Sequence, residues 1–448
     1  MLVRDIASLW VAIFASFFFF ACAFAVAGGV NAYTDGMMEN GISTDDYLAL
    51  CEYVGLVPAI TIRFQMGQDA DVEEARDWVE YVNGDVSSPY GALRAARGHP
   101  APYNVTYWYL GNEISGQARQ PNYPNNSTLL GPPGVEEYKG MLTNIVPPML
   151  KASSTGTTCG LLLAAFQQVN LRQLVADLTT CCFGTGTLRL LTVSGSVQWN
   201  AAWAEAVGDH IYASSFHDGY LAQPKPSAWT QQAVTVCAKR PRGEFMGAVA
   251  ALRTTLDKTG KKIAISADEW GLGPPWRVKT FGTAHGMYAA GFLGAVTRGA
   301  RANNLQFSNY FEPVNEGAIQ VLPFNSSLTP VGEVMRLYSH HATGDLLELP
   351  TDANDPEGDL DATATLSSDG GTLIVTVASL SAVGWATTEL SLGLVGFAAS
   401  SGTTVTLEAQ GFSETSMFDA KTESAKVAHG KVAVSVPPFS VVQLTLSK

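Results

Sequence analysis

Residues 105–113 read VTYWYLGNE, an aromatic and β-branched run that ends in Gly-Asn-Glu. Aromatic and β-branched residues favour a strand, and a glycine directly after them favours its end. We therefore predict a strand at 105–110, with Asn112 and Glu113 just beyond its carboxyl end. A glutamate at this place is either a surface charge or a catalytic acid at the mouth of a barrel.

Similar runs recur along the chain and are separated by helical patterns. Further strands are expected at 58–64, 159–166, 209–216, 261–270 and 302–311, with helices at 43–54, 71–83, 246–257 and 285–298. In the first two helices, Ser43 and Asp71 are the expected N-terminal caps. Six mostly apolar strands alternating with helices are typical of parallel strands covered by helices. The predicted fold is an α/β (β/α)8 TIM-type barrel over residues 28–344.

The pattern changes near residue 345. A Pro/Asp/Gly-rich linker at 349–359 precedes alternating apolar and polar runs at 372–380, 403–410, 431–438 and 441–447. Alternation with a period of two residues predicts half-buried antiparallel strands. We expect a C-terminal β-sandwich domain at 345–448.

The first 27 residues form an apolar leader that ends in the small residues Ala23, Ala25 and Ala27. This pattern predicts a cleaved signal peptide at 1–27 and a secreted, extracellular protein, and an uncleaved membrane anchor at 9–27 is the alternative. Four Asn-x-Ser/Thr triplets, at Asn104, Asn125, Asn126 and Asn325, agree with a secreted glycoprotein.

Five cysteines remain beyond the leader, at 51, 159, 181, 182 and 237. An odd number leaves at least one thiol without an intramolecular partner, and the pairing is open. Cys181 and Cys182 are either two loop thiols or a vicinal disulfide.

Charge and motifs exclude several classes of function. A formal charge of −13 without a cluster of Lys and Arg argues against nucleic-acid binding. No G-x-S-x-G, H-E-x-x-H or Walker motif is present, so we expect no cofactor and no metal. We expect His340 and His341 at the surface and His210 packed within a strand.

Two glutamates follow strand-like runs: Glu113, and Glu269 within AISADEW at 264–270. The mouth of a (β/α)8 barrel lies at the carboxyl ends of its strands. Retaining glycoside hydrolysis needs two carboxyl groups about 5 Å apart, one as acid/base and one as nucleophile. Two strand ends across one barrel mouth can supply this pair.

The stretches WYLGNE at 108–113 and ISADEW at 265–270 resemble the acid/base and nucleophile motifs of glycoside hydrolase family 51, the α-L-arabinofuranosidases. The resemblance implies a (β/α)8 barrel with a C-terminal β-sandwich, Glu113 as acid/base, Glu269 as nucleophile and Asn112 as a ligand of a sugar hydroxyl. Residues 41–60, 73–84, 329–341 and 436–446 are also similar to the family, so the resemblance covers roughly residues 40–448.

The chain departs from the family pattern at several positions. The family's Ser-x-His-x-Tyr pattern corresponds to Ser215 and His217, but Gly219 stands where Tyr is expected and Tyr220 comes one place later. Arg63 replaces an Asn of the third strand, and Glu312 replaces a sugar-binding Gln. These changes bear on sugar specificity, and His217, Tyr220 and Glu312 are the expected substrate contacts. The family's first two barrel strands should precede residue 40, which predicts a barrel that lacks them.

Two tryptophans follow Glu269. Trp270 and Trp276 are candidate stacking platforms for a sugar ring, and core or rim packing is the alternative. Trp108 is expected in the core.

The sequence thus predicts a secreted retaining glycosidase, an exo-acting α-L-arabinofuranosidase that acts on plant cell-wall or similar polysaccharide. The alternatives are another retaining enzyme of the same clan, such as a β-xylosidase or endoglucanase, and an inactive carbohydrate-binding remnant. A membrane partner is expected only if the leader stays uncleaved, and the oligomeric state is open.

Overall fold

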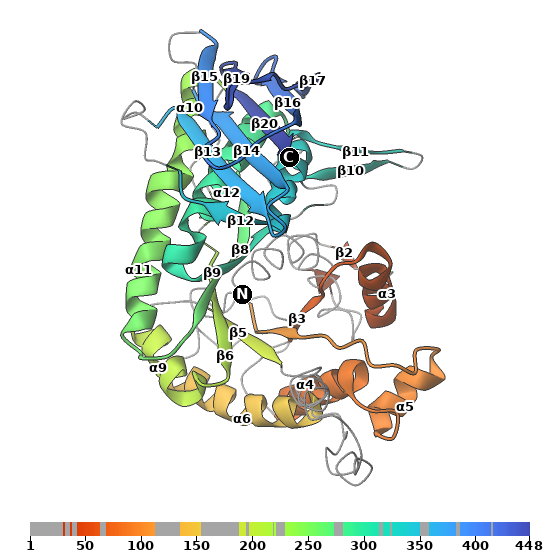
Figure 1. The fold of residues 1–448 in the computed structure, drawn as a ribbon. Helices are drawn as coiled ribbons and strands as arrows, with labels where there is room; N and C mark the ends of the chain where they lie inside the picture. Colours follow the sequence, from red (N-terminus) through yellow and green to blue (C-terminus); the bar gives the residue numbers. More distant parts are fainter. Residues whose placement is uncertain are drawn as a thin grey trace, which may run out of the picture. The chain divides into compact units, whose positions relative to one another are not determined.

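A computed structural model describes residues 30–31, 36–37, 43–62, 69–112, 135–153, 188–193, 197–217, 219–220, 229–272, 281–311, 313, 317–322, 325–349, 358–381, 386–413 and 415–448. These residues fall into two compact units (Figure 1). The first unit draws on residues 18–215 and 255–263, and the second unit draws on residues 216–254 and 264–448.

The first unit contains four parallel strands alternating with helices. Its elements are β1 (Val30–Asn31), β2 (Gly36–Met37), α3 (Thr44–Val54), β3 (Ala59–Ile62), α4 (Asp69–Asn83), α5 (Pro89–Ala96), β4 (Tyr107–Leu110), α6 (Val135–Ser153), β5 (Arg189–Val193), α9 (Val197–Val207) and β6 (Ile211–Ser215). Parallel pairing runs in the order β3, β4, β5, β6. Strands β3, β4 and β6 confirm predicted strands, β5 was not predicted, and the expected strand at 159–166 lies outside the described residues.

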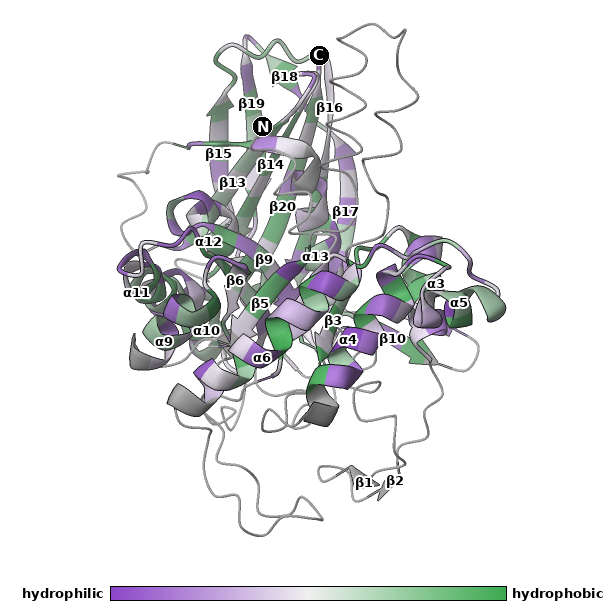
Figure 2. Ribbon diagram, turned by 90° about the horizontal axis from the view of Figure 1, so that it is seen from below, coloured by the Kyte–Doolittle hydropathy of each residue, from purple (hydrophilic) through white to green (hydrophobic). Residues whose placement is uncertain are grey.

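Local capping explains where the first helix starts and stops. The Ser43 side chain accepts from the Asp46 backbone N–H, the Asp46 carboxylate accepts from the Ser43 N–H, and Gly55 ends α3 in the left-handed region at φ 73°. The capping prediction for Asp71 was wrong, because α4 already begins at Asp69. Figure 2 shows hydrophobic and hydrophilic residues alternating along α4 and α6, as expected for helices that cover a sheet on one side.

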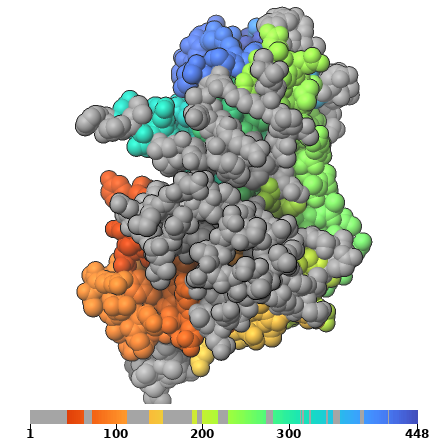
Figure 3. All heavy atoms as spheres, turned by 180° about the vertical axis from the view of Figure 1, so that it is seen from behind, coloured from red at the N-terminus to blue at the C-terminus, as the bar shows by residue number. Residues whose placement is uncertain are grey.

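The second unit begins with three parallel strands. Strand β8 (Ala264–Gly271) pairs with β7 (Gly219–Tyr220) on one side and β9 (Leu305–Tyr310) on the other. A long helical segment, α10 (Gln231–Arg240), the π-helical turn η1 (Pro241–Phe245) and α11 (Met246–Asp257), precedes β8, and it appears in light green in Figure 3. Helix α12 (Thr283–Asn303) joins β8 to β9 and is buried over most of its length. The predicted strands at 261–270 and 302–311 and helix at 246–257 are confirmed.

The C-terminal part of the second unit is antiparallel. After the hairpin β10 (Ile319–Leu322) and β11 (Asn325–Leu328), helix α13 (Pro330–Ser339) and the 3-10 turn η3 (His340–Thr343), the strands are β12 (Gly344–Leu347), β13 (Leu360–Ser367), β14 (Thr372–Ser379), β15 (Thr388–Gly393), β16 (Ser401–Ala409), β17 (Phe418–Ser424), β18 (Val427–Ala428), β19 (Lys431–Val436) and β20 (Ser440–Ser447). They form a six-stranded sheet, β12-β13-β14-β20-β16-β17, and a three-stranded sheet, β15-β19-β18. Valine and leucine side chains of both sheets make one core. The predicted antiparallel sandwich is confirmed.

Helix α12 is fixed to this sandwich by a buried ion pair. The Arg298 guanidinium donates to both oxygens of the Asp361 carboxylate on β13, whose side chain is fully buried. Gly294, one turn earlier, leaves room for this carboxylate, because a Cβ there would collide with it. The helix that follows β8 is therefore held from the sandwich side within the same unit.

Two predictions about histidines were wrong. His341 is fully buried, and its ring contacts the hydroxyls of Thr365 and Thr376 at 3.0 and 2.7 Å. The reason is that η3 packs against β13 and β14, whose threonines satisfy both ring nitrogens. His210 is exposed, because it lies in the turn before β6 and not within the strand.

Several predictions fall on residues outside the described ranges. These are the leader at 1–27, Cys159, Cys181, Cys182, Asn125 and Asn126. Among the described residues, Cys51 and Cys237 are free thiols, and no helix is both long and apolar enough to cross a membrane.

Candidate active site

Strand β8 carries two adjacent carboxylates in a strand whose residues are all buried. The Asp268 side chain is 2% exposed and the Glu269 side chain is 11% exposed. Buried carboxylates are costly unless they are paired or hydrogen-bonded, so their partners indicate what the site does. Glu269 is the more accessible of the two.

His217 lies between these carboxylates. Its Nδ1 is 3.4 Å from Glu269 Oε2, and its Nε2 is 3.3 Å from Asp268 Oδ1. The ring is brought there by its neighbour Phe216, whose backbone N–H donates to Ser266 O at 2.8 Å and to Asp268 Oδ1 at 3.2 Å. One imidazole therefore faces a carboxylate oxygen with each of its nitrogens.

Trp270 belongs to the core, and the expectation of an exposed stacking platform is corrected. The side chain is fully buried, with its ring stacked on Phe292 of α12 at 4.2 Å and edge-on to Tyr310 at 4.8 Å. The register between β8 and β9 is irregular from Ala267 to Trp270, so simple alternation does not predict which way each side chain points. The Trp270 ring packs into the core against Phe292 and Tyr310.

The other predicted site residues are described only in part. Tyr220 lies on β7, and its backbone pairs with Gly271, two residues after Glu269. In the first unit, Gly111 at φ 89° turns the chain after β4 and is followed by the half-buried Asn112. Glu113, Trp276, Arg63 and Glu312 lie outside the described residues.

The strand that leads to Asn112 is held firmly in the first unit. The Asn83 side chain donates to Val105 O at 2.8 Å and accepts from Val105 N at 2.7 Å, just before β4. Trp108 is fully buried, as predicted, and meets Trp78 of α4 edge-on at 6.1 Å. The end of β4 is thus anchored by packing and by hydrogen bonds.

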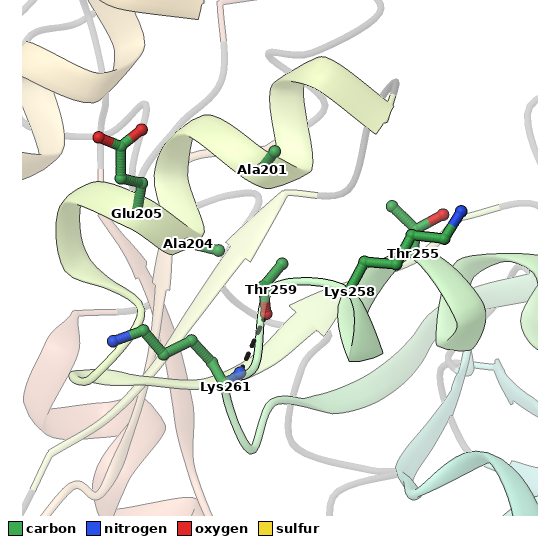
Figure 4. Close-up of a pocket in the computed structure, with 7 residues that line it drawn as sticks. All are labelled: Ala201, Ala204, Glu205, Thr255, Lys258, Thr259 and Lys261. Atoms are coloured by element: carbon green, nitrogen blue, oxygen red, sulfur yellow. Dashed lines mark hydrogen bonds between the residues drawn. The ribbon is translucent and has the colours of Figure 1, made fainter.

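The first unit also contains an open pocket of about 360 Å³ (Figure 4). It is lined by Ala201, Ala204, Glu205, Thr255, Lys258, Thr259 and Lys261. Lys261 pairs with Asp209 and Glu205 with Lys139. Asp209 lies in the turn that leads into β6, so the pocket is near the amino end of that strand, whereas barrel chemistry occurs at carboxyl ends. We assign no catalytic role to it.

Asp268 is the functional candidate that sequence reasoning missed. The sequence does show a second acid next to Glu269 in a mostly apolar strand, and this could have indicated Asp268. Its partner His217 lies 51 positions earlier, so the contact is invisible in the local pattern. Within the described residues, no group of three His, Cys, Asp or Glu side chains is placed to hold a metal ion.

Residues 27–128 match the family model of the alpha-L-arabinofuranosidase 1 domain. This segment includes Asn112 and Glu113, and it excludes the β8 carboxylates. The match supports the resemblance seen in the sequence.

Two curated relatives agree with this match. The probable alpha-L-arabinofuranosidase C of Aspergillus fumigatus is 40% identical over 81 residues, which is 18% of this chain and 15% of the relative. The intracellular exo-alpha-L-arabinofuranosidase of Bacteroides ovatus is 34% identical over 97 residues, 21% of this chain and 18% of the relative. The aligned stretch thus spans less than a fifth of each relative.

The fold is shared over the whole chain with solved structures. The thermostable GH51 alpha-L-arabinofuranosidase of Thermotoga petrophila superposes with a TM-score of 0.67 at 20% identity, covering 99% of this chain and 89% of that one. This likeness confirms the predicted fold class, a barrel of β/α units followed by a β-sandwich. Residues 27–128 are thus similar in sequence to α-L-arabinofuranosidases, and the chain shares its fold with the GH51 enzyme of Thermotoga petrophila.

Proposed function

We propose that this protein is a retaining α-L-arabinofuranosidase with Glu269 as the nucleophile and Glu113 as the acid/base. The observation that carries the proposal is the environment of Glu269. It lies near the carboxyl end of a buried parallel strand, is 11% exposed, and has the His217 ring 3.4 Å from its Oε2. A nucleophilic carboxylate needs this combination of limited access, a fixed position and a nearby group that favours its ionised form.

The domain match supports the assignment of Glu113. The matched segment contains the Gly111-Asn112-Glu113 sequence, and the relatives that share sequence with this chain are named arabinofuranosidases. Gly111, in the left-handed region, follows the last residue of β4, and Asn112 comes directly after it. An acid at this place suits protonation of a leaving group at the mouth of a barrel.

In the first chemical step, a Glu269 carboxylate oxygen attacks the anomeric carbon of the bound sugar. The bond between that carbon and the glycosidic oxygen breaks, and the Glu113 carboxyl gives its proton to the departing oxygen. The product of this step is a covalent glycosyl ester on Glu269 and a free alcohol. Two inversions at the anomeric carbon over the full cycle give overall retention.

In the second step, Glu113, now a carboxylate, removes a proton from water, and the water oxygen attacks the anomeric carbon. The bond to Glu269 breaks and the nucleophile returns as a carboxylate. An N–H of His217 directed at Glu269 keeps this carboxylate ionised before the first step and stabilises it as the leaving group of the second.

The proposed substrate is a terminal arabinofuranosyl group of a polysaccharide or oligosaccharide. The relative from Bacteroides ovatus is named an exo-acting enzyme, which agrees with removal of terminal sugars. Asn112, Tyr220 and Glu312 are the proposed contacts to the sugar, whereas both ring nitrogens of His217, which the sequence suggested as a further contact, face the β8 carboxylates. No cofactor or metal takes part in this chemistry.

The departures at Gly219 and Glu312 favour a second candidate. A retaining β-xylosidase or endoglucanase of the same clan would use the same two carboxylates with different hydroxyl contacts. Gly219, which pairs with Trp270 in the register of β7 and β8, offers no side chain where the family has a tyrosine. An inactive carbohydrate-binding protein is the third option.

We also propose that the protein is secreted with cleavage of residues 1–27 and carries N-linked glycans. The apolar leader supports secretion. Two of the four acceptor asparagines, Asn104 and Asn325, are described, and both are exposed.

Hydrolysis of 4-nitrophenyl α-L-arabinofuranoside tests the proposed activity. Glu269→Ala should lower kcat by about 10⁴-fold or more, and sodium azide should restore turnover by replacing the missing nucleophile. Ser308→Ala is the matched control in the neighbouring strand. Ser308 is 1% exposed and its hydroxyl has no hydrogen-bond partner among the residues that the structure describes, so this variant should stay active.

The substrate panel separates the candidates. Turnover of the arabinofuranoside by the wild type, lost in Glu269→Ala alone, supports the proposal. Turnover of the xyloside or of cellulose in its place would support the second candidate. A folded wild type that cleaves none of these substrates while still binding polysaccharide would favour the binding protein.

A further inference from the structure

We propose that Asp268 is a positioning residue that holds the His217 ring with both nitrogens protonated, so that the ring keeps Glu269 ionised and aimed at the substrate. The inference rests on the proposed function of Glu269 as the nucleophile. Asp268 does not touch the substrate in this scheme. It acts through His217.

The geometry gives Asp268 two ways to fix the histidine. One oxygen, Oδ1, accepts the backbone N–H of Phe216 at 3.2 Å and faces His217 Nε2 at 3.3 Å. The same atom therefore fixes the backbone next to His217 and the far side of its ring. A side chain held at two points loses most of its rotational freedom, and the remaining nitrogen points at Glu269.

The arrangement of the charges favours a protonated ring. A neutral imidazole has one N–H donor and one acceptor, whereas a protonated imidazole donates with both nitrogens. Here both nitrogens face carboxylate oxygens, at 3.3 and 3.4 Å. A neutral ring would turn a lone pair towards one of them, so two carboxylates stabilise the imidazolium.

Among the residues that the structure describes, Asp268 and Glu269 of β8 face the ring. The aromatic groups packed behind are uncharged. Phe245 of the π-helical turn η1 lies 5.8 Å from Phe216 and 4.7 Å from Phe292 between ring centroids. These buried rings make the surroundings of Phe216, the residue before His217, apolar, and charges interact more strongly in such surroundings.

The two carboxylates have different access, which separates their roles. Glu269 has an 11% exposed side chain and can reach a ligand, while Asp268 is 2% exposed and holds the backbone. Asp268 is therefore suited to orientation and Glu269 to attack.

The test variant is Asp268→Asn, which removes the charge and keeps the shape and an oxygen that can accept from Phe216. Loss of one of two carboxylates should make the ring easier to deprotonate, and a neutral ring stabilises the Glu269 carboxylate less. We expect the acid limb of the kcat/KM profile to be displaced, because the lost charge acts on Glu269 both directly and through His217, and we expect kcat at pH 6 to fall about 10-fold. Ser308→Ala, buried in the adjacent strand, should leave the profile in place.

A direct reading of the ring makes the result independent of turnover. Histidines labelled with ¹⁵N report by NMR whether each ring nitrogen carries a proton, and His217→Gln assigns the signal among the seven histidines. In the wild type we expect both His217 nitrogens protonated at pH 6. In Asp268→Asn the midpoint of its titration should fall by one unit or more.

The outcomes distinguish this inference from the proposed function. An unchanged His217 titration and an unchanged acid limb in folded Asp268→Asn would overturn the inference, even with an active wild type. If the wild type cleaves no arabinofuranoside but its His217 titration falls in the variant, the positioning role stands and the proposed activity fails. Should Asp268→Asn not fold, the wild type decides alone, because a neutral His217 at pH 6 contradicts the proposal.

Discussion

Burial of His341 predicts that acid destabilises the sandwich end of the second unit. The ring is fully buried, and its nitrogens contact Thr365 Oγ1 at 3.0 Å and Thr376 Oγ1 at 2.7 Å. Hydroxyls can satisfy a neutral ring, but they cannot neutralise a charge. Burial, together with the nearby His340, lowers the pKa of His341 to about 4.

The sign and size of the effect follow from the two states. In the unfolded chain a histidine has a pKa near 6.5. Between that pH and about pH 4 the unfolded state binds a proton at this residue and the folded state does not. Stability is complete above about pH 6.5, falls as the pH drops, and levels off below about pH 4. A difference of roughly 2.5 units corresponds to about 3 kcal/mol in full, of which about 2 kcal/mol is lost by pH 5.

The variant His341→Gln isolates this contribution, because glutamine offers one donor and one acceptor and does not titrate. Urea unfolding followed by circular dichroism at pH 7.5, 6.0, 5.0 and 4.0 gives the free energy of unfolding for both proteins. The difference between wild type and variant should change by about 3 kcal/mol across this range. His340→Gln, at the exposed neighbouring position, is the control and should keep the wild-type dependence. Parallel curves for wild type and His341→Gln would refute the reasoning.

Two further predictions concern the ion pair on α12 and the proposed glycans. Arg298→Met should lower the free energy of unfolding by about 3 kcal/mol, because it leaves the fully buried Asp361 carboxylate unpaired. Asp361→Asn should cost less, since Arg298 is 31% exposed and can reach water, and equal losses in urea unfolding would contradict this asymmetry. In protein secreted from a eukaryotic host, Asn325→Gln should remove one N-glycan by mass spectrometry. Asn104→Gln should remove less, because Val105 beside it is buried and bound to Asn83.

Local patterns predicted the elements whose cause is local. Helix α11 begins at Met246 and ends at Asp257, as expected from its spacing of apolar residues, and Gly55 ends α3. Strand β13 was missed because it alternates alanine with threonine and aspartate, residues that give a weak strand signal. It is stabilised instead by pairing with β12 and β14. Such pairing is a property of the sheet and not of the segment.

The part of the site that was predictable from the sequence is the acid at the end of one predicted strand. Glu269 was selected because it is an acid next to an aromatic residue at a predicted strand end, and the structure places it in a buried strand beside a histidine. Trp270 was predicted to be an exposed stacking platform, because the sequence does not show that its ring packs on Phe292. The burial of His341 depends on Thr365 and Thr376, which come 24 and 35 residues later in the chain. A pattern read over neighbouring residues therefore cannot predict it.

Burying two adjacent carboxylates costs free energy, and this cost makes Asp268 informative in the structure. Two carboxylates next to each other in a buried strand repel and lose hydration, so a fold that needed only stability would place apolar residues there. The arrangement persists because His217 lies between them and the Phe216 N–H binds one of them. A fully apolar site could hold β8 just as well, but it could not attack an anomeric carbon. The strand therefore gives up stability at Asp268 and Glu269, and that loss marks the place where chemistry is expected.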